Sequence, residues 1–438
     1  MNSMISLASL NYLRDGWIRK CWDKVSSLLI KLISPKLAAL FCYWTIDWGL
    51  ENDGPTLLCL FRESFIKDIE ELRKNTSLNL PVVMGGFTRF QMGWVPREMQ
   101  IQTFYQGYRG INRDRAIARS RVFAERLIQL VRKKRRVDGI LSANFDYWQD
   151  TGFKEVCREK GIPFLVLSRE HPVIPKVCEE VVRWYTEAAF VFEGNAIAVA
   201  GSSTKEVMMR VSNLCDESKM VITGLPRYDA WRIVDCSTPP AEREFVTLLT
   251  FASGYYADAT FKEVLRAFLE SAQEHSNQPV KFLVKTKDFS DTSYLKSILP
   301  SGLSSNVICG HDFPLPDVLP RSRLTVNYNS LSLVEAAMAR TPIVLPAWGE
   351  CHDRGSDVMY SIENTHVQKV AAFAYDSEML KAIMRDNING VIKTYGEPEA
   401  QAFISDFIYV PQGKTYSEEF MDFCKTNLQT GLGESKNT

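Results

Sequence analysis

An arginine and an aspartate stand two residues apart on a turn near the middle of the chain. A β-branched run ends at Gly224, Pro226 prevents its continuation as a strand, and Arg227 and Asp229 follow. The composition over residues 235–241 is that of a linker, and a new alternation of strand-like and helix-like segments begins beyond it. We therefore expect Arg227 and Asp229 to face whatever binds between two halves of the protein, with Arg227 suited to a phosphate and Asp229 to nucleophilic or acid/base chemistry.

A second carboxylate follows an earlier strand-like run, which leads to Glu170 and His171. Glu170 and Asp229 would come from separate strand ends, and such a pair could divide the acid/base and nucleophile roles, by analogy with glycoside hydrolases. His171 is a further catalytic candidate because histidine is the usual acid/base group; a buried neighbour is the alternative. For Asp229 the alternative is an ion pair with Arg227 or a cap for the following turn.

The second half of the chain offers a candidate phosphate site at a helix start. A strand-like run leads to Asn329 and Ser330, which can cap a helix predicted over residues 330–340. The N-terminus of such a helix carries roughly +0.5 charge and suits a phosphate. Ser332 would add a hydroxyl donor, and Glu335 could accept hydrogen bonds from ribose or sugar hydroxyls. An ordinary cap followed by a surface glutamate is the alternative.

Strand-like and helix-like segments alternate in both halves. In the first half strands are predicted at 56–61, 80–84, 139–142, 163–167, 188–192 and 220–223, and helices at 112–135 and 194–212. In the second half strands are predicted at 245–250, 280–284, 307–309, 324–326 and 342–346, and helices at 260–275 and 330–340. Such alternation is typical of mostly parallel sheets, so we predict an α/β fold with two Rossmann-type doubly wound domains facing a cleft.

Length and composition set the domain count and exclude some partners. The 438 residues exceed one ordinary core and divide into N-terminal amphipathic helices (1–50), a first α/β domain (51–233), a second α/β domain (234–395) and a helical return segment with a frayed tail (396–438). The 52 basic residues balance 52 acidic residues, so no nucleic-acid partner is predicted. The ten cysteines lack zinc-like spacing, which indicates thiols in a reducing cytoplasm and predicts no metal site.

Two basic stretches leave contact with a membrane open. An amphipathic basic helix is predicted up to Pro35, followed by a second apolar helix through Trp48; these helices either pack on the body of the protein or dock on an anionic membrane. The basic run at 132–136 is either a solvated helix end or a second membrane-facing patch. No secretory signal or transmembrane run is apparent, so we expect a cytoplasmic protein, with peripheral attachment at the inner face of the plasma membrane as the open alternative.

Two stretches resemble a known class of enzymes. The segment from Thr325 to Val344 resembles the nucleotide-binding stretch of GT-B-type glycosyltransferases, and Gly224-Leu-Pro-Arg-Tyr-Asp229 resembles the Gly-x-Pro-Arg-x-Asp segment of the bacterial surface-polysaccharide group. That group contains CDP-glycerol glycerophosphotransferases and the Kdo transferases of capsule, O-antigen or lipopolysaccharide assembly. The resemblance covers about residues 139–346. It implies a two-lobed GT-B fold, no cofactor or obligatory metal, acceptor binding in the first lobe and donor binding mainly in the second.

Two departures from the pattern bear on the transferred group. The Trp-His-Gly segment of the glycerophosphotransferases is absent, whereas Arg169-Glu170 is similar to the basic residue and glutamate of the Kdo-using relatives. Where many relatives have Lys-x-His-Pro, Lys285 is kept and Lys287 replaces the histidine. The resemblance also places His311 in a loop that contacts the nucleotide base.

The resemblance therefore implies a retaining glycosyltransferase that passes Kdo from CMP-Kdo to a lipid-linked surface glycan. In that reading Asp229 is the nucleophile and Glu170 the acid/base group, and Arg227 and Lys285 hold the donor phosphate. Two alternatives stay open at this point: a CDP-glycerol-type glycerophosphotransferase of teichoic-acid-like polymers, and a non-catalytic binding subunit docked on a membrane.

Overall fold

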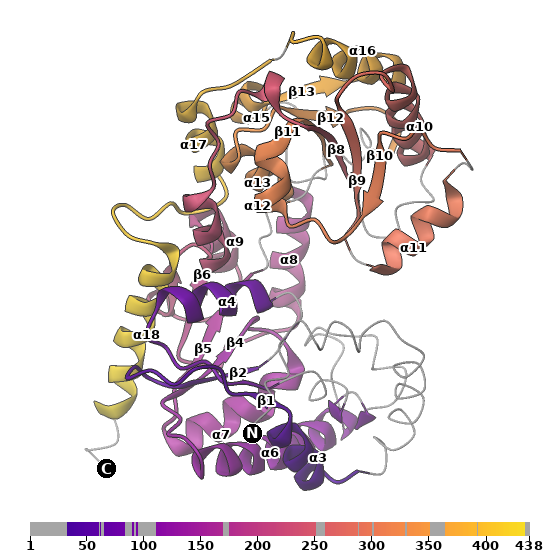
Figure 1. Ribbon diagram of the computed structural model, residues 1–438. Helices are drawn as coiled ribbons and strands as arrows, with labels where there is room; N and C mark the ends of the chain where they lie inside the picture. Colours follow the sequence, from indigo (N-terminus) through magenta and orange to yellow (C-terminus); the bar gives the residue numbers. More distant parts are fainter. Residues whose placement is uncertain are drawn as a thin grey trace.

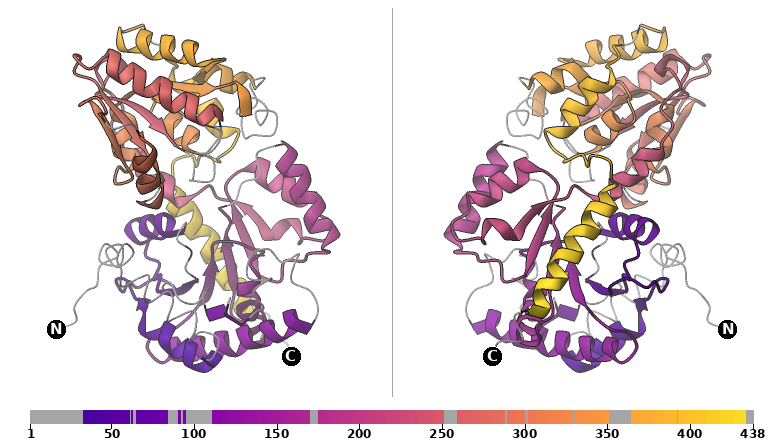
Figure 2. Two further views of the ribbon diagram at one scale, coloured as in Figure 1. Left: turned by 90° about the vertical axis from the view of Figure 1, so that its right-hand side faces the viewer. Right: turned by 90° about the vertical axis from the view of Figure 1, so that its left-hand side faces the viewer.

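The computed structural model describes residues 33–60, 62, 65–83, 90–91, 93–94, 111–169, 175–250, 259–287, 289–299, 302–328, 331–350, 364–391 and 393–433. They form two lobes, each built on a largely parallel sheet, and a long C-terminal helix returns along the first lobe (Figures 1 and 2). The predicted α/β class with two doubly wound lobes is therefore confirmed.

The sheet of the first lobe has the strand order β1-β3-β2-β4-β5-β6-β7. All neighbouring pairs are parallel except β1 with β3. Alternate residues of β2 face opposite sides: Leu57 and Cys59 belong to one core cluster, Leu58 and Leu60 to the other. The strands are Ile46–Asp47 (β1), Leu57–Leu60 (β2), Val82–Val83 (β3), Gly139–Ser142 (β4), Phe164–Leu167 (β5), Ala196–Val199 (β6) and Met220–Ile222 (β7).

Helices cover both faces of this sheet (Figure 2). α7 ends where Gly161 takes a left-handed conformation with φ of 62° that terminates the helix. A 3-10 helix, η6 (Pro226–Ile233), follows β7 directly. The α-helices are Pro35–Trp44 (α3), Ile66–Asn75 (α4), Ile111–Arg132 (α6), Thr151–Lys160 (α7), Pro175–Glu187 (α8) and Ser202–Met209 (α9).

Two predictions around residue 190 are wrong. The segment 188–192, predicted as a strand, is irregular chain after α8, with a positive φ of 48° at Ala189. The strand is β6, inside the stretch predicted as a helix over 194–212, of which only α9 is helical. β6 lies between β5 and β7 and is fully buried. A short run of alanine and β-branched residues does not reveal from its periodicity whether it forms a strand or a helix.

The sheet of the second lobe is entirely parallel, with the order β10-β9-β8-β11-β12-β13. The five predicted strands are present, with ends shifted by a residue or two, and β13 is an additional strand that the sequence reading did not identify. The strands are Phe245–Leu249 (β8), Lys281–Lys285 (β9), Val307–Gly310 (β10), Ser322–Val326 (β11), Ile343–Pro346 (β12) and Ala371–Ala374 (β13). The α-helices are Ala259–Glu274 (α10), Phe289–Ile298 (α11), Leu315–Val318 (α12), Ser332–Met338 (α13), Thr365–Val370 (α15), Ser377–Ile388 (α16) and Glu397–Ser405 (α17).

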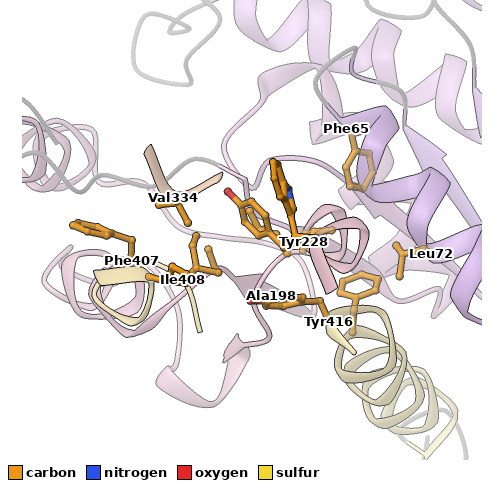
Figure 3. Packing of buried hydrophobic residues seen from close by; sticks show 14 of the residues in the cluster. Phe65, Leu72, Ala198, Tyr228, Val334, Phe407, Ile408 and Tyr416 are labelled. Carbon is orange, nitrogen blue, oxygen red and sulfur yellow. The ribbon is translucent and has the colours of Figure 1, made fainter. Parts of the chain in front are cut away.

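The chain crosses between the lobes twice. The first crossing follows η6, and the second joins α17 to α18 (Tyr416–Gly433), which packs on the first lobe. One hydrophobic cluster contains residues from both crossings and both lobes, including Tyr228 of η6, Val334 of α13 and Tyr416 of α18 (Figure 3). The two lobes are therefore joined by a shared core as well as by the chain.

The N-terminal part differs in detail from its prediction. The first predicted helix lies largely within residues 1–32, outside the described residues. The second is α3, which follows Ser34, whose hydroxyl accepts a hydrogen bond from the Leu37 amide at 3.3 Å. It ends at Trp44, so strand β1 occupies part of the stretch expected to be helical. None of the helices in the described ranges is both long and apolar enough to cross a membrane.

Candidate active site between the lobes

Charged residues of both lobes lie at the carboxyl ends of the parallel strands. Arg227 lies in η6 after β7, and the first turn of α4, after β2, carries Lys67 and Asp68. From the second lobe, Lys285 ends β9 and Glu335 lies in α13 after β11. Ligands of open α/β sheets bind outside the carboxyl ends of the strands, so this is the place to expect the chemistry.

Asp68 holds Arg227 in place. Asp68 is fully buried and accepts three hydrogen bonds from Arg227: from the backbone amide at 3.1 Å, from Nε at 3.0 Å and from Nη2. Burial works against the charge of Arg227, but the Asp68 carboxylate more than offsets it and raises the pKa of Arg227. The guanidinium is thus permanently charged and fixed in orientation, as a preformed phosphate site requires.

A second arginine shares the same carboxylate. Nε of Arg169 lies 3.9 Å from Asp68 Oδ2, and its side chain is 17% exposed. One carboxylate therefore lies near two guanidinium groups. The sequence had singled out Arg169 only as the neighbour of Glu170.

Glu335 faces this cationic group from the second lobe. Burial raises the pKa of Glu335, and the charges of Lys67, Arg227 and Lys285 act in the opposite direction. Glu335 also helps burial to raise the pKa of the Tyr228 hydroxyl. The predicted donor-site residues Arg227, Lys285 and Glu335 are therefore electrostatic neighbours, although they lie far apart in sequence.

Lys285 and the predicted residues that follow β9 and β10 make further contacts within the second lobe. Lys285 donates to the backbone carbonyl of Thr286 at 2.5 Å, whereas Lys287 is exposed. His311 follows β10; its Nδ1 lies 3.2 Å from the Thr292 hydroxyl and its Nε2 lies 2.9 Å from Asp312. His311 thus belongs to a polar group at the outer strand of the sheet.

The helix start predicted to bind phosphate is only partly described. Asn329 and Ser330 lie outside the described residues, and α13 begins at Ser332. The Ser332 hydroxyl donates to Asn327 Oδ1 at 3.0 Å, so it holds the end of β11 to the helix. The Asn327 Nδ2 group is buried and has no hydrogen-bond partner among the residues described.

Asp229 binds the start of the return helix, α18. It is buried, and its two carboxylate oxygens accept hydrogen bonds from the backbone amides of Tyr416 at 2.7 Å and Ser417 at 2.8 Å. These amides are among the first of α18, which have no carbonyl partner within the helix. Asp229 therefore binds the start of the return helix, a structural role that differs from both predicted ones, the ion pair with Arg227 and the cap of the following turn. The other two predicted catalytic residues, Glu170 and His171, lie outside the described residues.

The sequence reading missed Asp68, and a signal for it was present. Phe65, Ile69 and Leu72 are buried and recur at helical spacing, and Asp68 lies on the same face of α4. A carboxylate on the apolar face of a helix is seldom buried unless it is paired.

Among the described residues, no group of three or more histidine, cysteine, aspartate or glutamate side chains could hold a metal ion.

Comparison with known proteins supports the fold. No protein-family model and no curated protein matches the chain. A Listeria monocytogenes structure assigned as a UDP-N-acetylglucosamine 2-epimerase matches with a TM-score of 0.50 and 10% identity, over 86% of this chain and 97% of that chain. This likeness shows the two-lobed GT-B fold, and it does not extend to activity or substrate.

Two further solved structures match with lower TM-scores. The wall teichoic acid polymerase TagF matches with a TM-score of 0.49 and 10% identity, over 95% of this chain and 100% of that chain. UDP-GlcNAc 2-epimerase from Neisseria meningitidis, bound to UDP-GlcNAc, matches with a TM-score of 0.46 and 12% identity, over 85% of this chain and 99% of that chain.

Proposed function

We propose that the protein is a GT-B-type glycosyltransferase that passes a sugar from a nucleotide-activated donor to a glycan on a lipid carrier. The supporting observation is the group of charges at the facing strand ends: Arg169 and Arg227 lie beside Asp68, and the charges of Lys67, Arg227 and Lys285 act on the pKa of Glu335. Cations fixed in place before the reaction stabilise the negative charge that develops on a departing phosphate.

Each charged residue has a separate part in this proposal. Arg227, oriented by Asp68, binds the donor phosphate, and Lys285 contacts it from the second lobe. Glu335 accepts hydrogen bonds from hydroxyls of the donor. Glu170, which directly follows Arg169 in the sequence, acts as the acid/base group. Asp229 acts at a distance by fixing η6, and with it the backbone of Arg227.

We further propose a cytidine-activated donor, with CMP-Kdo as the first candidate. The support is the pair Arg169-Glu170 and the turn from Gly224 to Asp229, which resemble the Kdo-using transferases. A lipid-linked acceptor would place the enzyme peripherally at the inner face of the plasma membrane.

The test is incubation with CMP-Kdo, CDP-glycerol or UDP-hexoses and a glycan acceptor, with the released nucleotide and the product identified. We expect CMP to be released from CMP-Kdo and no phosphorus to enter the acceptor. CDP-glycerol would also release CMP but would leave a phosphate in the product, which would identify a glycerophosphotransferase. Release of UDP alone would exclude the cytidine donor.

Matched variants connect the result to the site. Arg227→Ala should lower turnover roughly 100-fold or more, the loss typical of one preorganised donor to a developing charge. Arg266→Ala, an exposed arginine on α10, is the control and should leave turnover unchanged. Nucleotide binding that depends on Arg227 without any transfer would instead indicate a non-catalytic binding subunit.

A further inference from the structure

The segment that follows β4 is buried almost throughout, although it connects a strand to a helix. Of residues 139–154, all of which the structure describes, only Tyr147 is not buried. Connecting segments normally run over the surface, because buried polar groups need hydrogen-bond partners. A buried connection at the carboxyl end of a strand therefore requires partners from within the lobe.

Polar side chains supply such partners on the N-terminal side of Tyr147. Lys154 of α7 is buried and donates to the carbonyl oxygen of Phe145 at 2.5 Å. The hydroxyl of Tyr185 in α8 donates to a carboxylate oxygen of Asp146 at 2.5 Å. The chain before Tyr147 is thus held by two helices of the first lobe.

On the C-terminal side of Tyr147, a fully buried carboxylate binds an arginine. Ser142 Oγ donates to one oxygen of Asp150 at 2.5 Å, and Arg62 Nη2 donates to the other at 3.0 Å. The Arg62 guanidinium also lies over the ring of Tyr147, 4.6 Å from its centre. A carboxylate and an aromatic ring therefore orient this planar group, while 12% of the Arg62 side chain stays exposed.

Arg62 lies in the same row of strand ends as the candidate active site. Arg62 follows β2 and Tyr147 follows β4, whose neighbour β5 leads to Arg169. α4, which carries Asp68, also follows β2. Parallel strands bring these residues to one edge of the sheet, where ligands of open α/β sheets bind. Arg62 and Arg227 are thus two arginines of one lobe, each bound to a buried aspartate of its own.

We propose that Arg62 binds an anionic group of the acceptor, a phosphate or a carboxylate, at the strand ends of the first lobe. The inference rests on the proposed function and adds the chemistry of the acceptor to it. A guanidinium matches the geometry of both anions through paired N–H donors. Because Asp150 and Tyr147 orient the guanidinium beforehand, little conformational entropy is lost when an anion binds.

A purely structural tie between β2 and β4 is the alternative role of Arg62. Such a tie would explain why Asp150 is paired, but a buried ion pair adds little net stability compared with apolar side chains of the same size. It does not account for the partial exposure of Arg62 and Tyr147 at the edge where ligands bind. The two roles differ in what they predict for anion binding.

The experiment is calorimetric titration of the full-length protein with glucose, glucose 1-phosphate and glucuronate. We expect at least one of the anionic sugars to bind roughly tenfold more tightly than glucose, since a charge-assisted hydrogen bond contributes about that factor. Tighter binding of the phosphate sugar alone, or of glucuronate alone, would assign the site to a phosphate or to a carboxylate. Equal affinity for all three sugars, or no binding of either anion, would overturn the proposal.

A paired substitution tests Arg62 without leaving a buried charge unpaired. Arg62→Gln with Asp150→Asn replaces the ion pair by two amides and should lower the anion affinity roughly tenfold or more. The control, Arg73→Gln with Asp47→Asn, changes an ion pair of 2.7 Å near the other end of α4 and should leave the affinity unchanged. If the paired Arg62 variant is less stable in denaturant but binds anions as the wild type does, the role is structural and the proposal fails.

Arg227 separates this site from that of the donor. Arg227→Gln should leave the Arg62-dependent binding intact; anion binding that depends on Arg227 and not on Arg62 would belong to the donor site and would overturn the proposal. In the transfer assay, the paired Arg62 variant should raise the KM for an anionic acceptor roughly tenfold and leave the KM for the donor unchanged. The titration needs no turnover, so failure of the transfer reaction and failure of anion binding are separate outcomes.

Discussion

The two sides of η6 use buried aspartates for different ends. On the side toward the strand ends, Asp68 binds the Arg227 guanidinium and fixes its orientation. On the opposite side, Asp229 binds two backbone amides and leaves the start of α18 fully satisfied. The role of a buried carboxylate therefore follows from its hydrogen-bond partners. Asp229 lies within the motif that resembles the transferases, yet its partners are backbone amides of α18.

The largest effect should follow from removing Asp68. Asp68→Ala leaves Arg227 buried without its partner, and we expect the free energy of unfolding to fall by about 3–5 kcal/mol. Denaturant unfolding of variant and wild type measures this loss. Asp68→Asn keeps the shape and should lose less; a loss below about 1 kcal/mol for the alanine variant would contradict a buried ion pair.

Asp229 should matter for stability and little for chemistry. Asp229→Ala removes the acceptor of two buried amides at the start of α18, those of Tyr416 and Ser417, and should lower the free energy of unfolding by about 2 kcal/mol. Asp229→Asn retains one acceptor and should keep most of the turnover. If the asparagine variant is as stable as wild type and inactive, Asp229 is the nucleophile that the sequence predicted and the contrast between the two sides of η6 fails.

Gly224 allows a test of the close contact between the start of η6 and the return helix. Its φ is +69°, and a Cβ atom there would lie 2.4 Å from the Tyr416 ring. Gly224→Ala should therefore cost about 1–2 kcal/mol of unfolding free energy, from backbone strain and the displaced ring together. Adding Tyr416→Ala removes the clash but not the backbone strain. The loss of unfolding free energy in the double variant should therefore be smaller than the sum of the losses in the two single variants. Full additivity would mean that the ring is not in the way.

Glu335 should show the smallest effect, as a dependence on pH. Because burial raises the pKa of Glu335 above its ordinary 4.5, the stability it contributes is present below that value and is lost as pH rises through the folded-state pKa. Glu335→Gln removes this dependence. The stability of the variant relative to wild type should rise with pH, measured by thermal unfolding between acidic and neutral pH. An opposite slope would mean that the neighbouring cations, not burial, dominate.

Much of the fold followed from the sequence because parallel strands between helices leave a clear pattern. Gly139–Ser142 was predicted to the residue, since an apolar run bounded by Asp138 and Asn144 has few other readings. β6 could not be separated from a helix, because Ala196–Val199 is short and both of its faces are buried. β13 was missed because Ala371–Ala374 shows no alternation of apolar and polar residues.

The sequence predicted which residues belong to the candidate site better than it predicted which residues pair with one another. Arg227, Lys285 and Glu335 were chosen as residues after strands, and the structure brings them into electrostatic contact. The pairing of Asp68 with Arg227 joins residues 159 positions apart, and no local pattern specifies it. The capping of α18 by Asp229 depends likewise on where the last helix returns.

Because α18, the last helix of the described chain, packs on the first lobe, the two lobes cannot finish folding in the order in which they are translated. Phe420 and Cys424 of α18 are fully buried in the first lobe, and Leu428 lies against Gly139 of β4. The sheet of the second lobe, in contrast, is contained within residues 245–374. On a ribosome, where domains fold as they emerge, the second lobe has all of its strands before the last helix appears. The lobe that is translated first is therefore finished last, and a chain shortened before residue 416 lacks part of the core of its N-terminal lobe.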